Sequence, residues 1–381
     1  MPQTVPSRDQ IRRSIEVEYW VIDEDGRLVE PEGLVDASPG AEREFVRPML
    51  EVKTTPCETT AQLEAELFER VQRVLDRARE LDKRLVPLAT PLNAEEVREL
   101  PSERTRIQNA VVGTDFEYVR HCAGTHLHFE QLPGRKVDQL NTLIAMDPAL
   151  ALVNSARHFR GQPVANGARS KLYRWLAYDG LPNQGVLWPY VEDAAEWEGR
   201  LDRCYEAFVQ SSLDVGLDRA TVEDSFEPES AVWTPVQLRS EFGTVEWRSP
   251  DTALPSQIVR LADDIGSIVE QLRDADVVIH DETDPDLGAI GPGGDTVGLP
   301  PFQTVVDHTE AAIRDGLDSR ALRSYLGTFG FDLSAYEPLS GAIEQETVTV
   351  SEARDRRLAQ ADRLERDIGG SGPSNSVSRR V

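Results

Sequence analysis

Lysine is scarce in this chain of 381 residues, which contains only four: Lys53, Lys83, Lys136 and Lys171. Arginine supplies the rest of the positive charge, and 67 acidic residues against 41 basic ones give a net charge of −26. Nucleic-acid backbones and anionic membranes are themselves negative, so this charge argues against both as partners. Acid-rich, lysine-poor surfaces are typical of halophilic proteins, because molar salt screens the repulsion between carboxylates. The alternative is an ordinary acidic enzyme.

Cysteines and long apolar runs are also few. The three cysteines, Cys57, Cys122 and Cys204, cannot all pair and show no CxxC spacing, which argues against a disulfide framework or a zinc ribbon. No apolar run reaches 18 residues, and no apolar segment follows the two arginines near the N-terminus. We therefore expect a cytoplasmic protein with reduced thiols.

Hydrophobic patterns divide the chain into strands and helices. Alternating patterns predict strands over residues 14–23, 44–55, 84–90, 124–130, 242–249 and 276–280. Helical patterns cover residues 59–82, 136–159, 193–213, 255–274, 303–315 and 344–367. The strands are amphipathic and do not alternate regularly with the helices, so we expect an α+β fold with a mainly antiparallel sheet covered by helices on its outer face.

A single domain is expected over residues 1–368, with no internal repeat. Residues 369–381 have the composition of a disordered tail. Residues 282–300 are rich in glycine, proline and aspartate and lack periodicity, which is typical of an active-site lid or of a plain connector. The sequence leaves the oligomeric state open.

Several predicted strands carry two functional side chains separated by one residue. Because alternate residues of a strand share a face, each pair points the same way. The pairs are Glu16 and Glu18, Glu51 and Lys53, His126 and His128, and Glu246 and Arg248, with Glu58 beyond the turn that follows Lys53. One such pair is typical of the solvated face of a sheet, but four predict one shared site.

A site with so many carboxylates needs cations, since like charges at close range otherwise disfavour ionisation. Glutamates with a histidine suit Mg²⁺ or Mn²⁺ better than zinc. These ions commonly bridge nucleotide phosphates, and an arginine such as Arg248 can neutralise charge on a transferred phosphoryl group. The chain has no GxxxxGK[ST] motif, so a P-loop is not the phosphate cradle.

Five blocks of sequence, taken in order, resemble those of the glutamate–cysteine ligase 2 family. The blocks are IEVEYWV, LEVKTTPCET, CAGTHLHFE, ARSKLYRWLAYDGLPNQG and GTVEWRSPDTAL, and they fall between about residues 12 and 280. This family belongs to the glutamine synthetase-like carboxylate–amine ligases. The resemblance implies a curved, six-stranded antiparallel sheet that forms a funnel, with ATP entering at one end and the amino acids at the other.

The resemblance also implies roles for individual residues. The metal ligands would be Glu16, Glu18, Glu51, Glu58, His126 and Glu246. The ATP phosphates would contact His126, Lys53 and Arg248, and catalysis would depend on Arg248 and Glu51. Substrate binding would fall to Arg169, Arg174 and Asn183, although the block over residues 168–185 matches the family pattern only in part.

The implied reaction joins the γ-carboxyl group of L-glutamate to the amine of L-cysteine, in the biosynthesis of low-molecular-weight thiols. ATP would first convert the carboxylate to an acyl phosphate, and the amine would then displace phosphate. Two alternatives stay open: a ligase of the same fold that uses another acid or amine, and a catalytically silent protein that binds a nucleotide or a metal.

Overall fold

The structure is a computed structural model that describes residues 10–94, 96–181, 183–281, 290–343 and 346–370. Its main strands are β1 (Arg13–Asp23), β2 (Ala41–Arg43), β3 (Met49–Lys53), β4 (Lys83–Val86), β5 (Thr125–Glu130), β8 (Val236–Arg239) and β9 (Thr244–Trp247). Its longer helices are α1 (Thr60–Glu80), α2 (Glu103–Val112), α4 (Lys136–Ala145), α6 (Ala194–Asp214), α9 (Pro255–Gln271), α10 (Phe302–Arg314) and α12 (Val350–Gly370). The predicted α+β class is confirmed.

One antiparallel sheet organises the molecule. Its strands pair in the order β2-β3-β1-β5-β9-β8, and β4 also pairs with β1. Trp20 of β1 pairs with Met49 of β3 and with Val86 of β4, so β3 and β4 lie on opposite sides of β1. On the side of β1 away from β3, β5 pairs with residues 13–17 of β1 and β4 pairs with residues 20–23. β4 and β5 therefore follow one another along the same edge of β1. The sheet contains seven strands but is six strands wide, as the resemblance implies.

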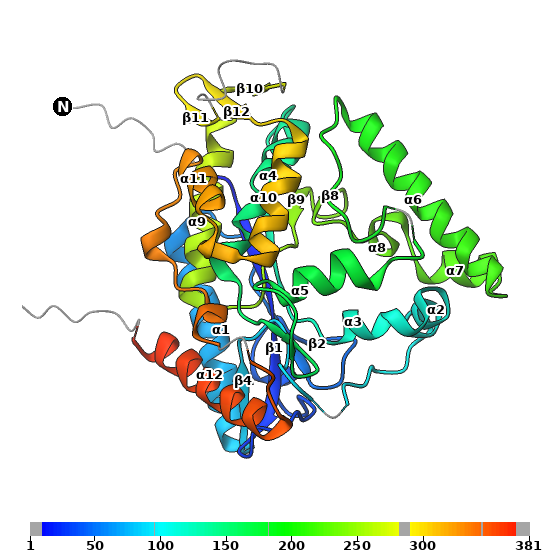
Figure 1. Ribbon diagram of the computed structural model, residues 1–381, viewed down its shortest axis with the longest axis vertical. Helices are drawn as coiled ribbons and strands as arrows, with labels where there is room; N and C mark the ends of the chain where they lie inside the picture. The colour runs from blue at the N-terminus through cyan, green and yellow to red at the C-terminus, as the bar shows by residue number, and fades with distance from the viewer. Residues whose placement is uncertain (1–9, 95, 182, 282–289, 344–345, 371–381) are drawn as a thin grey trace, which may run out of the picture.

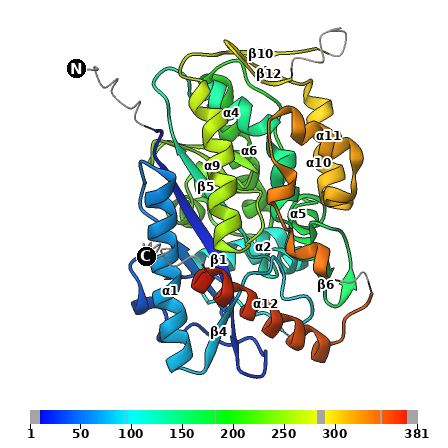
Figure 2. The same cartoon turned by 90° about the vertical axis from the view of Figure 1, so that its left-hand side faces the viewer.

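The two faces of β1 have different surroundings. Ile15, Val17 and Tyr19 are fully buried in the main hydrophobic core. Helices α1, α9 and α12 cover this face, and Figure 2 shows α1 and α9 lying across it. Glu16 and Glu18 alternate with these residues and line a cleft on the opposite face. The alternation in the sequence thus separates core from cleft.

Helix α1 illustrates how well the longer helices are predicted. The Thr59 hydroxyl accepts a hydrogen bond from the Gln62 backbone, and the Gln62 side chain accepts from the Thr59 backbone, which completes a capping box. Its buried residues fall at helical spacing and include Leu63, Leu67 and Val71.

A second group of helices lies across the sheet from α1, α9 and α12 (Figure 1). It consists of α2, α3 (Phe116–Arg120), α6, α7 (Arg219–Ser225) and α8 (Pro228–Ala231). A separate core holds α2, α6 and α7 together, with Ile107 of α2 packed among Phe208, Val222 and Phe226. Residues of α2, α3 and α8 line the cleft.

The predicted helix over residues 136–159 is wrong in its second half. The helix ends at Ala145, and residues 147–153 form a 3-10 segment whose side chains are all buried. Proline at position 148 disfavours the helical conformation of the preceding Asp147 and removes a backbone donor. Because all its side chains are buried, this segment is as apolar as a buried helix, so its composition alone does not distinguish the two.

The segment after α9 differs from the prediction as well. Residues 276–279 do form a strand, β10 (Asp276–Ile279), but it belongs to a separate small sheet with β11 (Gly291–Gly293) and β12 (Thr296–Leu299). The expected irregular loop over 282–300 is therefore wrong for this hairpin, and residues 282–289 lie outside the described residues, as do residues 371–381 of the expected tail. Residues 369–370 end α12. Among the described residues, no helix has the length and apolar character needed to cross a bilayer.

Candidate active site

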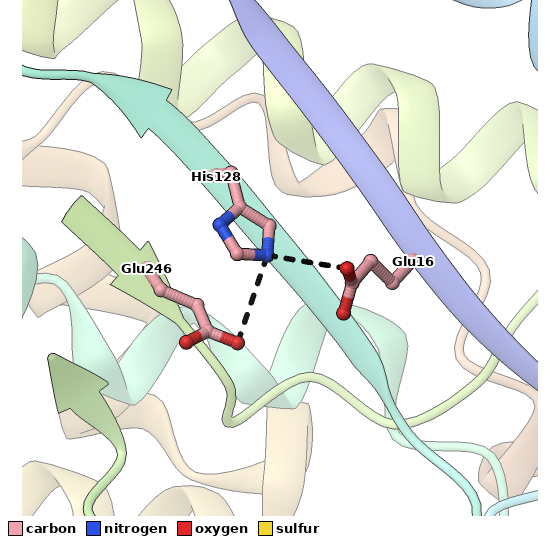
Figure 3. Close-up of side chains that lie close together, drawn as sticks. All are labelled: Glu16, His128 and Glu246. Carbon is pink, nitrogen blue, oxygen red and sulfur yellow. Dashed lines mark ion pairs between the residues drawn. The ribbon is translucent and has the colours of Figure 1, made fainter. Parts of the chain in front are cut away.

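Antiparallel pairing brings together the polar residues of β1, β5 and β9. Glu16 pairs with His126, and His128 pairs with Glu246, and directly paired residues project from the same face. The Nδ1 atom of His126 lies 3.2 Å from the Glu16 carboxylate and 3.4 Å from that of Glu246. Nε2 of His128 lies 3.8 Å and 3.7 Å from the same two groups (Figure 3). We call these four residues the imidazole cluster.

The protonation of the imidazole cluster suits a cation. Burial acts to raise the pKa of Glu16, but hydrogen bonds with His126 and His128 lower it overall. Burial likewise opposes ionisation of Glu246, yet the charge of Arg248, followed by those of the histidines, lowers its pKa to about 2. Burial and Arg248 lower the pKa of His126. At neutral pH the cluster therefore offers two carboxylates and a neutral imidazole.

A second group, the carboxylate cluster, consists of Glu18, Glu44 and Glu51. Each contributes an oxygen to a set of atoms that all lie within 4.8 Å of one another. Burial, followed by the charges of neighbouring glutamates, raises the pKa values of Glu44 and Glu51 to about 8. Burial also raises the pKa of Glu18 to about 7, against the opposing charge of Arg169. Three such groups ionise together only when a cation offsets their charge, and oxygen ligands suit Mg²⁺.

Backbone and lysine donors hold the carboxylate cluster in place. The Gly124 N–H donates to Glu18 over 2.6 Å. Nζ of Lys53 lies 2.9 Å from Glu51 and 3.8 Å from Glu16, so one ammonium group connects the two clusters. Burial acts to lower the pKa of Lys53, but the charges of Glu51 and Glu16 raise it overall, which keeps this group positively charged.

The same cleft is lined by four arginines: Arg104, Arg169, Arg239 and Arg248. Arg239 donates to the Glu246 carboxylate over 3.1 Å, and Nε of Arg248 lies 3.6 Å from that carboxylate. Arg169 donates to the backbone carbonyls of Arg248 and Ser249 over 3.2 Å and 3.1 Å. The guanidinium groups of Arg169 and Arg248 therefore lie beside the carboxylates, where they can meet an anionic ligand.

The cleft has a volume of about 420 Å³, and aromatic rings form much of its wall. The rings belong to Phe45, Phe116, Tyr173, Tyr178, Trp233 and Phe242. Tyr173 stacks on Trp233 with centroids 4.5 Å apart, and the Arg169 guanidinium lies 5.2 Å from the centroid of Tyr173. Tyr173 lies in a π-helical turn, Leu172–Ala177, that follows α5 (Ala168–Lys171). Such turns are frequent at functional sites.

A neighbouring pocket of about 430 Å³ shares His128 and Phe242 with the cleft. Phe242 is 55% exposed, and Arg239 lies over its ring at 5.2 Å. Arg12, Arg13 and Gln131 are among the other residues that line this pocket. Both clusters therefore line the cleft itself, and the second pocket adjoins the cleft at His128 and Phe242.

Comparison with known proteins identifies the family. The model of glutamate–cysteine ligase family 2 matches residues 15–290, which is more than half of the chain. The chain belongs to this family. No curated protein matches it.

Two solved structures are similar to this chain in fold. The first is glutamate–cysteine ligase from Francisella tularensis in complex with AMP, with a TM-score of 0.55 and 13% identity over 95% of this chain and 93% of that one. The second is a bifunctional glutathione synthetase from Pasteurella multocida, with a TM-score of 0.51 and 15% identity over 94% of this chain. The chain spans 53% of the length of that second protein.

The structure brings most of the predicted site residues of this family 2 ligase together. The predicted residues that line the cleft are Glu16, Glu18, Glu51, Lys53, His126, Arg169, Glu246 and Arg248. His128, which the sequence pairs with His126, joins them and hydrogen-bonds Thr244 over 3.1 Å.

Three predicted residues lie elsewhere. Arg174 is buried and forms an ion pair with Asp147. Asn183 lies outside the cleft with a φ of 66°, and its carbonyl accepts a hydrogen bond from the Trp188 indole. Glu58 is exposed just before α1, where its backbone N–H donates to Gln62. The structure therefore gives these three no place in the cleft.

Glu44 is the main site residue that the sequence does not predict. A straight strand over residues 44–55 would direct Glu44 to the face opposite Glu51, because their numbers differ in parity. Instead, the backbone turns between β2 and β3, and Glu42 pairs with Glu51. This turn returns Glu44 to the cleft. The sequence carries no periodic signal for such a reversal.

Proposed function

We propose that this family 2 ligase joins the γ-carboxyl group of L-glutamate to the amine of L-cysteine, with ATP as the energy source and γ-glutamyl phosphate as the intermediate. The products would be γ-glutamylcysteine, ADP and phosphate. The observation that carries the proposal is that the imidazole cluster, the carboxylate cluster and Arg248 line one cleft, which a second pocket of similar volume adjoins at His128 and Phe242.

The residues of both clusters fit Mg²⁺ or Mn²⁺. Glu16, His126 and Glu246 would hold one ion, and Glu18, Glu44 and Glu51 would hold another. The raised pKa values of the three carboxylates support this assignment, since a cation would relieve the repulsion that raises them. Bound ions would neutralise phosphate charge during phosphoryl transfer. Glu51 would contribute to catalysis through this role.

We place ATP at the Phe242 end of the cleft. The exposed ring of Phe242 offers a surface on which a base can stack, and the pocket beyond it has the volume for a nucleoside. His128 and Lys53 lie toward the two clusters, where they can donate to phosphate oxygens. Arg248 would stabilise negative charge on the transferred group.

The amino acids would occupy the end that contains Tyr173 and Trp233. Arg169 can form a bidentate contact with a carboxylate of glutamate, and its own hydrogen bonds to backbone carbonyls fix its orientation. The stacked pair of Tyr173 and Trp233 offers an apolar wall for the side chain of the attacking amine. A thiol is small and weakly polar, so it suits such a wall.

Product analysis tests the proposal directly. Purified protein in molar KCl with Mg²⁺, ATP and glutamate should release ADP faster when cysteine is added, and mass spectrometry should find a γ-linked dipeptide. Equal rates with other amines would instead favour a ligase of different specificity. Binding of ATP and Mg²⁺ without ADP release in any combination of acid and amine would support a silent binding protein.

A further inference from the structure

A second large cavity lies beside the cleft. It has a volume of about 930 Å³, within the range of pockets that hold metabolites. Its lining includes five arginines, Arg47, Arg98, Arg106, Arg120 and Arg160, together with His121. None of these residues lines the cleft or has a place in the proposed reaction. We call this cavity the arginine pocket.

The lining of the arginine pocket contains more arginines than acidic residues, although the chain as a whole is acidic. Five guanidinium groups line it against the three carboxylates of Glu96, Glu99 and Glu117, whereas the whole chain has 67 acidic and 41 basic residues. On a surface with this overall excess of acid, a hollow with an excess of arginine needs a specific explanation. Guanidinium groups bind carboxylates and phosphates through paired hydrogen bonds.

Each of the five arginines already has a glutamate partner, and two of these pairs are weak competitors. Arg98 pairs with Glu96 and Arg106 with Glu103, and all four side chains are about half exposed or more. Exposed pairs of this kind contribute little to stability, so a ligand with several negative charges can displace them. The Nε atom of Arg47 is buried without a hydrogen-bond partner among the described residues.

Arg160 supports the same conclusion from its backbone. It occupies the turn of the hairpin between β6 (His158–Phe159) and β7 (Gln162–Pro163) with a φ of 49°. Glycine or asparagine is favoured in such a turn, and a residue with a long side chain is strained there. The turn places the Arg160 guanidinium at the pocket, where it pairs with Glu117.

The arginine pocket is adjacent to the cleft. Ser102 and Thr105 line both hollows, and the Ser102 hydroxyl caps α2 by accepting from the Thr105 backbone. The first turn of α2 therefore forms a shared wall. Arg104 of this turn lines the cleft, whereas Arg106 lines the arginine pocket.

We propose that the arginine pocket binds a small polyanion, that is, a ligand with two or more carboxylate or phosphate groups, at a site distinct from the cleft. The excess of arginine, the size of the cavity and the strained position of Arg160 support this assignment. The lining can bind carboxylates and phosphates alike, so one probe of each kind distinguishes the two classes of ligand.

Calorimetric titration of the full-length protein with citrate and with pyrophosphate tests the proposal. The protein is first treated with EDTA to remove metal from the cleft and is then exchanged into a chelator-free buffer with the lowest KCl concentration at which the protein stays folded. We expect at least one probe to bind, and the double variant Arg98→Gln, Arg106→Gln to weaken it about tenfold or more. Both side chains are exposed, so this variant should keep the wild-type melting temperature.

Two controls locate the binding. The double variant Arg73→Gln, Arg79→Gln removes two equally exposed arginines of α1 that also pair with acids of their own helix, and it should bind as the wild type does. Arg248→Gln, in the cleft, should also leave binding unchanged. Absence of binding by both probes up to about 20 mM would overturn the proposal. So would a loss of affinity in Arg248→Gln but not in the arginine-pocket variant.

Discussion

Asp147 and Arg174 form a buried ion pair beneath the strand that carries Glu246 and Arg248. Nη1 and Nη2 of Arg174 donate to the two carboxylate oxygens over 2.6 Å and 3.1 Å. Asp147 also accepts hydrogen bonds from the Trp247 indole and the Ser249 hydroxyl. Trp247 and Ser249 point away from the cleft, so Asp147 holds the rear of this strand while its front presents the site.

Arg174→Met should therefore destabilise the fold. Removing one partner of a buried pair leaves an uncompensated charge, which costs about 3–5 kcal/mol. Chemical denaturation measures the loss, and the exposed Arg79→Met should leave the unfolding midpoint unchanged. Normal stability of Arg174→Met combined with a raised KM for the acid would instead support the substrate-binding role that the sequence predicts.

Glu246→Gln should abolish ATP turnover without unfolding the protein. The amide keeps the size of the side chain but removes the charge that Arg239, Arg248 and a bound cation would share, so we expect a loss of about 100-fold or more in ADP release. Glu58→Gln is the matched control, because the sequence predicts both residues as metal ligands and the structure leaves Glu58 exposed. Equal losses in the two variants would contradict this distinction.

Glu44→Gln should weaken metal binding. Loss of one of three clustered carboxylates should lower the affinity for Mn²⁺ about tenfold, which electron paramagnetic resonance of the free ion measures directly. Glu42→Gln provides the comparison, since Glu42 is 57% exposed and lies 3.1 Å from Lys53 without joining the cluster. If the two variants bind Mn²⁺ equally well, Glu44 is not a ligand.

Salt should stabilise the protein. A net charge of −26 repels itself more strongly in the compact state than in the unfolded chain, and KCl screens this repulsion. We expect the melting temperature to rise between about 0.1 M and about 2 M KCl. A melting temperature that falls or stays constant over this range would favour an ordinary acidic enzyme.

The strands that carry the imidazole cluster can be predicted because their polar and apolar residues alternate without interruption. Glu16 and Glu18 alternate with core residues, and so do Glu246 and Arg248. The family resemblance then predicts that these residues share one site. The side chains that each strand contributes can thus be read from its own sequence, and the antiparallel register brings them together.

Features that depend on chain reversals and on packing between distant segments are not predictable in this way. Glu44 reaches the cleft through an irregular turn. Helix α2 has only two buried residues, Thr105 and Ile107, so its sequence carries little periodic apolar signal for a helix. The position of Arg174 in the core rather than the cleft depends on Asp147, which is 27 residues away in the chain. A polar residue in a family block does not reveal on which side of the backbone it lies.

The π-helical turn at Leu172–Ala177 requires a fixed number of residues in this segment. Tyr173 faces the cleft and the next residue, Arg174, faces the core. A π-helical turn contains about one residue more than an α-helical turn, and deleting that residue would restore α-helix and rotate everything after it by about 100°. Either the ring or the guanidinium would then lose its partner. Substitutions in this segment can be tolerated, but insertions and deletions should not be. The number of residues fixes the position of Tyr173 in the cleft and of Arg174 in the core at the same time.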